Sequence, residues 1–155
     1  MTNIREYLES HEFFSGISAS GLDFLAANAQ ARQWARGEAL FVQEDVAKHF
    51  YVVITGEVSV QIPALYGPPL IVQNLGEGAV LGWSWLIEPF RWAFEAHTKA
   101  DSEIIQFDGR AILARCEADH EFGYALFKRF ARLMSKRLEA ARLKMMDSWA
   151  APGTA

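Results

Sequence analysis

Residues 82–96 contain the side chains best suited to bind a small molecule. Arg91 is the only basic residue in this largely apolar segment, and its guanidinium could pair with an anion. It could equally be a turn arginine that stacks on a neighbouring tryptophan, and the sequence leaves both interpretations open. Ser84 could bond a phosphate or cap the short turn that follows it. The segment is therefore a candidate anion site.

The same segment is rich in aromatic residues. Trp83, Trp85 and Trp92 could form a wall against which a planar or apolar ligand lies. Packing in a core or lid is the more frequent reason for such a cluster. Glu88 and Glu95 are the acidic residues of the segment, and either could accept a hydrogen bond from a ligand.

The sequence offers little for catalysis. No pair of the four histidines has the spacing of metal ligands; they are His11, His49, His97 and His120. Ser84 is not part of a Gly-x-Ser-x-Gly elbow. A metal-dependent jelly-roll enzyme would need a cluster of His and carboxylate ligands that cannot be assembled from these residues. We expect a protein that is not an enzyme and that holds neither a metal nor a cofactor.

Short strands closed by glycine turns must position the candidate site. They run from Arg36 to Gly82 and are rich in β-branched and aromatic residues. Residues 62–69 contain three prolines and a glycine, so they predict a connection between two strands of a hairpin. We expect strands and turns over residues 38–107, arranged as a small antiparallel roll or barrel.

Helical patterns flank the predicted strands. Residues 4–35 look helical, with Ser18 as the N-cap of a helix over 19–31. Asp108 is placed to cap a short helix from Gly109 to Cys116. Residues 119–149 have no Gly after Gly123 and no Pro, which predicts one long helix, and residues 150–155 are expected to form a frayed tail.

The long C-terminal helix has an apolar stripe at three- and four-residue steps. Its members are Phe130, Met134, Leu138 (or Arg137), Ala141 and Met145. One face can cover the roll, while apolar residues on other faces need a second cover, which a partner helix would supply. A wide amphipathic helix that packs only on its own domain is the alternative. We expect a homodimer through this helix.

Length and composition limit the number of domains and the kinds of partner that this chain can have. A chain of 155 residues is expected to form a single domain, here over 1–149. The net charge of −4 does not indicate the basic surface that direct nucleic-acid binding needs. No apolar run is long enough to cross a membrane. Cys116 is the only cysteine, which excludes an internal disulfide and suits the reducing cytoplasm.

These strand motifs resemble the cyclic-nucleotide-binding domain family, the sensor module of catabolite-activator-type regulators. The matching motifs are Gly37-Glu38 before Leu40-Phe41, Tyr51-x-Val53-x-x-Gly56-x-Val58, and Leu75-Gly76-x-Gly78-x-x-x-Gly82. The resemblance covers nearly the whole chain. It implies an α+β, mainly β fold, in which an antiparallel β-roll or jelly roll is flanked by N-terminal helices and a long C-terminal helix. In the family this helix commonly forms a dimer interface, and a helix-turn-helix domain follows it in full-length regulators. This chain stops about where that domain would begin, so we expect a stand-alone sensor or interaction module.

The resemblance also implies a ligand loop that begins at Gly82. In the family, the loop's N–H groups face the cyclic phosphate, a glutamate accepts a hydrogen bond from the ribose 2′-hydroxyl, and an arginine pairs with the phosphate. Gly82 matches the loop glycine, but Trp83 stands at the glutamate position and can only donate. Arg91 fits the phosphate-pairing role in kind, although counting back from Asp101 and Glu103 puts Trp92 at that position.

Two hypotheses follow. In the first, the chain is a regulatory module that binds a small anionic ligand, with cyclic AMP or cyclic GMP as the candidates that the resemblance implies. The ligand-binding residues would be Gly82, Trp83, Ser84, Arg91 and Trp92, and the C-terminal helix would pass occupancy to an unknown effector protein. In the second, the tryptophans fill the pocket and the domain acts as a structural or interaction protein.

Overall fold

The computed structural model describes residues 2–149, which form a two-sheet roll with helices at one end and along one side. The helices are α1 (Ile4–Ser10), a 3₁₀ turn η1 (Glu12–Phe14), α2 (Ala19–Ala27), α3 (Gly109–Ala118) and α4 (His120–Trp149). The strands are β1 (Ala29–Trp34), β2 (Ala39–Phe41), β3 (His49–Thr55), β4 (Val58–Ile62), β5 (Leu70–Leu75), β6 (Val80–Leu81), β7 (Glu95–Thr98) and β8 (Ser102–Asp108). The mainly β, α+β architecture predicted from the sequence is confirmed.

The strands pair antiparallel in two four-stranded sheets, ordered β1-β8-β3-β6 and β2-β7-β4-β5. The connection between β4 and β5 contains Pro63, Pro68 and Pro69, as expected for residues that cannot extend a sheet. Val58 on β4 and Val53 on β3 are fully buried and belong to the same hydrophobic core, which lies between the two sheets.

The predicted helix caps are confirmed. Ser18 Oγ accepts a hydrogen bond of 3.1 Å from the backbone N–H of Gly21, and Asp108 Oδ1 accepts one of 3.1 Å from that of Ala111. Both side chains satisfy an N–H group that the first turn of the helix leaves without a partner.

The prediction that residues 29–35 continue a helix is wrong. Helix α2 ends at Ala27, Asn28 is its C-cap, and Ala29–Trp34 form β1. This strand pairs with β8 from Ala29 opposite Phe107 to Trp34 opposite Ser102. Alanine, glutamine and arginine favour helix locally, but the open edge of β8 supplies a full set of backbone partners and Trp34 becomes buried in the strand.

Aromatic side chains join the roll to the helices. Phe50 stacks on Phe107 at a centroid distance of 4.3 Å and on Trp85 at 5.0 Å. Phe130 of α4 meets the edges of Phe50 at 5.1 Å and Trp85 at 5.4 Å, and it also contacts Phe13 at 5.0 Å. We call these residues, with Phe14, the aromatic cluster. It fixes the first part of α4 against the roll.

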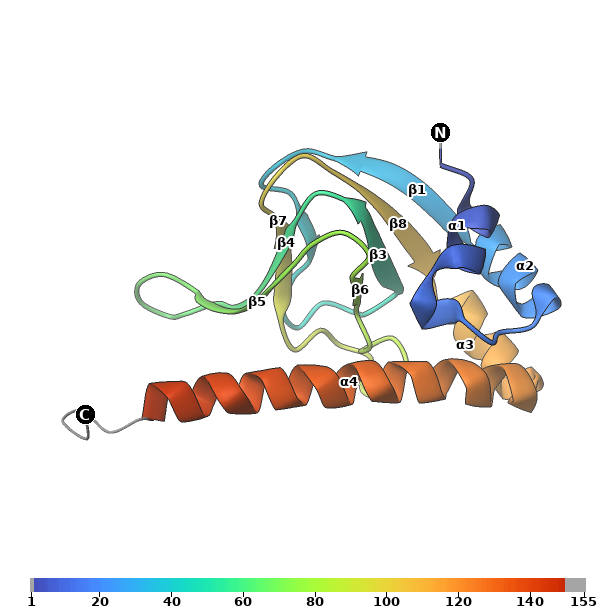
Figure 1. Cartoon of the computed structure of the whole chain (residues 1–155). Coiled ribbons are helices and arrows are strands. Elements are labelled where there is room, and N and C mark those ends of the chain that lie inside the picture. Colours follow the sequence, from blue (N-terminus) through green and yellow to red (C-terminus); the bar gives the residue numbers. More distant parts are fainter. Residues whose placement is uncertain (1, 150–155) are drawn as a thin grey trace.

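Helix α4 has two different halves (Figure 1). Its first part contributes buried Phe122, Leu126 and Phe130, whereas no residue between 131 and 147 is buried. The second half runs along the roll beneath β5 and the loop after β6. Its polar links to the roll include Arg137 to the Val80 carbonyl and Lys144 to the Ile71 carbonyl. The helix is therefore packed at one end and more loosely held at the other.

Phe130→Ala tests the role of the aromatic cluster. Phe130 is fully buried, so its removal leaves a cavity among rigid rings and should lower the free energy of unfolding by about 3–5 kcal/mol. Urea denaturation followed by circular dichroism measures this loss. Leu143→Ala is the control, because Leu143 is 54% exposed on the same helix and should cost well under about 1 kcal/mol. Equal losses in the two variants would contradict this packing.

Candidate functional site

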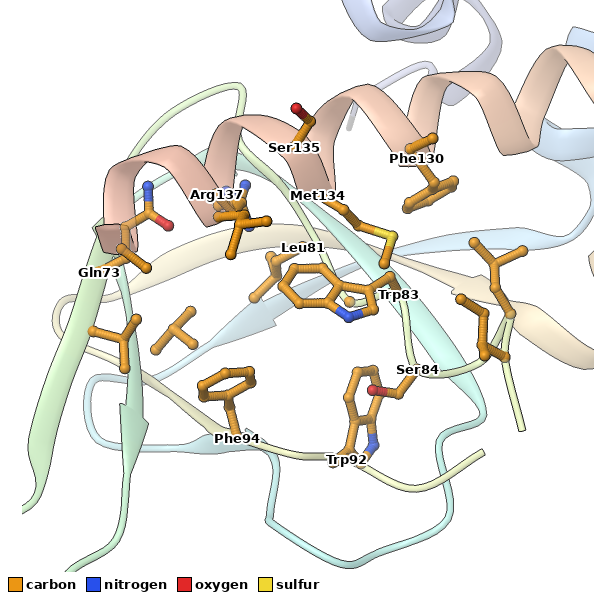
Figure 2. Close-up of a pocket in the computed structure, with 18 of the residues that line it drawn as sticks. Gln73, Leu81, Trp83, Ser84, Trp92, Phe94, Phe130, Met134, Ser135 and Arg137 are labelled. Atoms are coloured by element: carbon orange, nitrogen blue, oxygen red, sulfur yellow. The ribbon is translucent and has the colours of Figure 1, made fainter. Parts of the chain in front are cut away.

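A cavity of about 760 Å³ lies between the roll and the second half of α4. Its size is typical of sites for small organic ligands. Its walls come from β2, β4, β5, the segment after β6, and α4. The lining residues are Phe41, Val60, Val72, Gln73, Leu81, Gly82, Trp83, Ser84, Leu86, Ile87, Trp92, Phe94, Phe127, Phe130, Ala131, Met134, Ser135, Arg137, Leu138 and Ala141. Most of this lining is apolar (Figure 2).

The loop after β6 is held in a conformation that depends on Gly82. Its φ of +99° lies in the region that favours glycine, and a Cβ at this position would lie 2.9 Å from Trp92 Cη2. Trp85 fixes the loop from the other side, because its indole N–H donates a hydrogen bond of 2.9 Å to the Gly82 carbonyl. Trp85 is buried in the aromatic cluster and is not a cavity residue.

The other two tryptophans of this segment form part of the cavity wall without filling the cavity. Trp92 is buried and stacks on Phe41 with ring centroids 3.7 Å apart and planes at 12°. Trp83 meets Phe94 edge to face at 6.4 Å, and its ring lies between α4 and Phe94 in Figure 2. Because Trp83 is only partly buried, the space beside its ring stays open.

Four of the five sequence-predicted site residues meet at this cavity. Gly82, Trp83, Ser84 and Trp92 all line it. The structure places Arg91 outside it: the side chain is exposed and its Nη1 donates a hydrogen bond of 2.9 Å to the Glu44 carbonyl.

The acidic residues of the segment are also outside the cavity. Glu88 is exposed, and Glu95 lies 3.1 Å from His97 Nε2 on β7. Neither side chain lines the cavity. Among the described residues, no carboxylate is therefore available in this wall to accept a hydrogen bond from a ligand.

Arg137 is the charged residue that the sequence analysis did not assign to the site. Among the described residues it is the only charged one that lines the cavity. Its Nη2 donates a hydrogen bond of 2.5 Å to the carbonyl of Val80, the first residue of β6. The signal that could have identified it is a lone arginine inside the apolar stripe of the C-terminal helix, between Met134 and Ala141.

Arg137 is charged but lacks a carboxylate partner. No ion pair joins it to an acidic side chain within residues 2–149, whereas Arg142 pairs with Glu139 at 2.6 Å and Arg5 with Asp23 at 2.7 Å. Burial lowers the pKa of Arg137 from its ordinary value to about 10, because the surroundings disfavour the charged form. A guanidinium with this pKa is still protonated at neutral pH, so the cavity carries a net positive charge.

Residues 31–119 match the family described as "Cyclic nucleotide-binding domain". The match covers more than half of the 155 residues and spans both sheets and α3. This chain belongs to the cyclic nucleotide-binding domain family. The family match ends before α4, so it does not extend to Arg137.

Several solved structures share this fold. A putative cyclic nucleotide-binding protein from Geobacter metallireducens GS-15 superposes with a TM-score of 0.80 at 20% identity, covering 89% of this chain and 99% of that one. The sensor domain of the transcriptional regulator DNR from Pseudomonas aeruginosa gives 0.71 at 20% identity, with 87% and 91% covered. The catabolite activator protein of Thermus thermophilus gives 0.68 at 23% identity, with 86% and 61% covered. No curated protein matches the sequence.

The described part of the chain also bears on metal, membrane and thiol chemistry. Within it, no three His, Cys, Asp or Glu side chains come together as metal ligands would. None of the helices described there combines the length and apolar character needed to cross a bilayer. Cys116 is buried, and burial raises the pKa of its thiol to about 11, as expected for a packing residue.

Gly82→Ala tests the geometry of the loop. The substitution combines an unfavourable φ with a clash against Trp92, so the free energy of unfolding should fall by about 1–3 kcal/mol and the tryptophan emission should change. Denaturant midpoints and fluorescence spectra measure both effects. Gly67→Ala is the matched control: its φ of +85° is similar but no atom lies within 4 Å of the added Cβ. The same loss in both variants would show that Trp92 does not constrain the loop.

Proposed function

We propose that this domain is a non-enzymatic, ligand-sensing regulatory module that binds a small anionic ligand in the cavity between α4 and the roll. The observation that carries the proposal is Arg137, a cation that pairs with no carboxylate of residues 2–149 and lies at the wall of a cavity of about 760 Å³. An anion there would replace the water that burial removes from the guanidinium. Gly82, Ser84 and Trp92 supply the opposite wall, and Arg91 lies outside the direct binding set.

Helix α4 is the element that would report occupancy. Its first half is fixed in the aromatic cluster, while its second half lies over the cavity with no buried residue of its own. A ligand that contacts both Arg137 and the roll would hold this half in one position. Ligand binding can shift a conformational equilibrium only by its different affinity for the two states, and the contacts to α4 supply that difference.

A second copy of the chain is the partner that we propose for the exposed apolar residues of α4, some of which also line the cavity. Exposed Tyr124, Phe127, Leu138 and Met145 follow one another at intervals that fit a heptad repeat. Ala131, Met134 and Ala141 fill the remaining positions of the repeat. Such a seam favours a coiled-coil contact between two α4 helices, through which ligand occupancy would reach an effector protein. The single, buried cysteine is suited to a cytoplasmic location.

The alternative of a pocket closed by its own tryptophans has less support. It would require Trp83 to occupy the space that a ligand needs, yet about 760 Å³ is open beside its ring. The family membership makes cyclic AMP and cyclic GMP the first ligands to test. Other classes of anion must be tested as well, because no carboxylate of the described residues lines the cavity to accept a hydrogen bond from a ribose hydroxyl.

A thermal-shift panel of anions tests the proposal. It contains cyclic nucleotides, nucleotides, aryl carboxylates and fatty acids. At a concentration about 100-fold above Kd, a ligand stabilises the folded state by about 2.7 kcal/mol, which is roughly 5–10 °C in Tm for a chain of this size. At least one class should produce this shift in the wild type and in Arg91→Gln, and a much smaller one in Arg137→Gln. A folded wild type that responds to no class would favour the interaction-module hypothesis.

Lysine substitutions along the seam test the dimer. Light scattering after size-exclusion chromatography should give the mass of two chains for the wild type and of one for the double variant Tyr124→Lys, Met145→Lys. Both side chains are exposed and lie outside the cavity, so folding should be kept. Leu143→Lys is the control, because Leu143 lies on another face of the helix. A wild type that stays monomeric at about 100 μM would refute this interface.

A further inference from the structure

The polar groups of the cavity restrict which anion it can accept. Besides Arg137, the polar side chains in its wall are Gln73, Ser84 and Ser135, together with the indole N–H groups of Trp83 and Trp92. This set contains one positive charge, no negative charge and few acceptors. A ligand with many hydroxyl and amino donors would leave several of them without partners, at a cost of about 1–3 kcal/mol each.

The charge of the cavity is concentrated at one point. The guanidinium of Arg137 uses Nη2 to bond Val80, beside the loop that begins at Gly82. A guanidinium carries five N–H donors in a planar fork that matches the two oxygens of a carboxylate. Figure 2 shows Arg137 on the α4 side of the cavity, at the same end as Gln73 and away from Phe130. A single carboxylate suits this end, and the rest of the ligand would extend toward the apolar part.

The apolar part of the cavity is built from flat rings. Trp83 and Phe94 meet edge to face at 70°, and Trp92 presents its ring system next to them while stacked on Phe41. Phe127 and Phe130 complete the aromatic lining from α4. Aromatic walls favour stacked or edge-to-face contacts with another planar ring system, and these contacts add to the gain from burial.

We propose that the ligand of this cavity is an aromatic monocarboxylic acid, with its carboxylate on Arg137 and its ring system between Trp83, Phe94 and Trp92. This inference rests on the proposed ligand-sensing function and narrows the class of ligand. It differs from the expectation of a cyclic nucleotide, whose ribose and base would bring several polar groups into an apolar space. It assigns a specificity role to a residue of α4, outside the segment matched by the family.

A pair of fluorescent probes tests the inference. 1-Pyrenebutyrate and 1-pyrenebutanol have the same planar ring system and differ in charge, and energy transfer from tryptophan to pyrene reports binding to the protein. The butyrate should bind the wild type about tenfold more tightly than the butanol, because the carboxylate forms charge-assisted hydrogen bonds. Arg137→Gln should remove this difference and leave the butanol affinity unchanged. Arg137→Lys keeps the charge without the planar fork and should recover part of the difference.

Arg142→Gln is the matched control. Arg142 lies on the same helix, is exposed, pairs with Glu139 and does not line the cavity, so both probes should bind this variant as they bind the wild type. Retained butanol binding also shows that each variant is folded with an intact cavity.

The outcomes separate this inference from the proposed function. Equal affinity for the two probes, or a butyrate affinity that is unaffected by Arg137→Gln, would overturn the assignment of Arg137 as the carboxylate anchor. Dodecanoate binding more tightly than 1-pyrenebutyrate would overturn the proposal that the ligand is aromatic. Arg137-dependent binding of cyclic AMP without binding of 1-pyrenebutyrate would overturn the ligand class while the sensor function stands. If neither these probes nor any anion of the thermal-shift panel binds, both proposals fail.

Discussion

The insertion of Phe130 into the aromatic cluster is the contact on which the rest of the structure depends. Phe130 packs α4 against Phe13, Phe50 and Trp85, and the helix then continues beyond the cluster. A helix is stiff over a few turns, so fixing its first half determines where its second half lies. The cavity exists because this second half stands over the roll without packing into it.

The same arrangement explains why Arg137 is charged and unpaired. An arginine that loses water of hydration normally repays this cost through a carboxylate partner. Here the side chain has a single carbonyl contact and an apolar cavity beside it. A residue that costs stability in the free protein and matches an anion in the bound protein is a common feature of binding sites. The proposed anion site would account for both the cost at Arg137 and the open cavity.

Local patterns predicted the roll because strand alternation, glycine turns and helix caps act over a few residues. They did not predict β1, since Ala29–Trp34 favour helix locally and become a strand only by pairing with β8, whose residues lie far along the chain. The residues that line the candidate cavity were predicted in part. Gly82, Trp83, Ser84 and Trp92 lie in one segment, but Arg137 reaches the same cavity from a helix far along the chain. Arg91 shares the segment, yet a turn directs its guanidinium to the Glu44 carbonyl.

Hydrogen–deuterium exchange along α4 tests the central claim, that the second half of the helix is held loosely over an open cavity until a ligand fills it. In the free protein, the amides of residues 131–147 should exchange much faster than those of 124–130, because few buried contacts hold them. Saturation with a bound anion should slow exchange in 131–147 and leave 124–130 unchanged. Uniform protection along α4 in the free protein, or no change on ligand binding, would contradict the account.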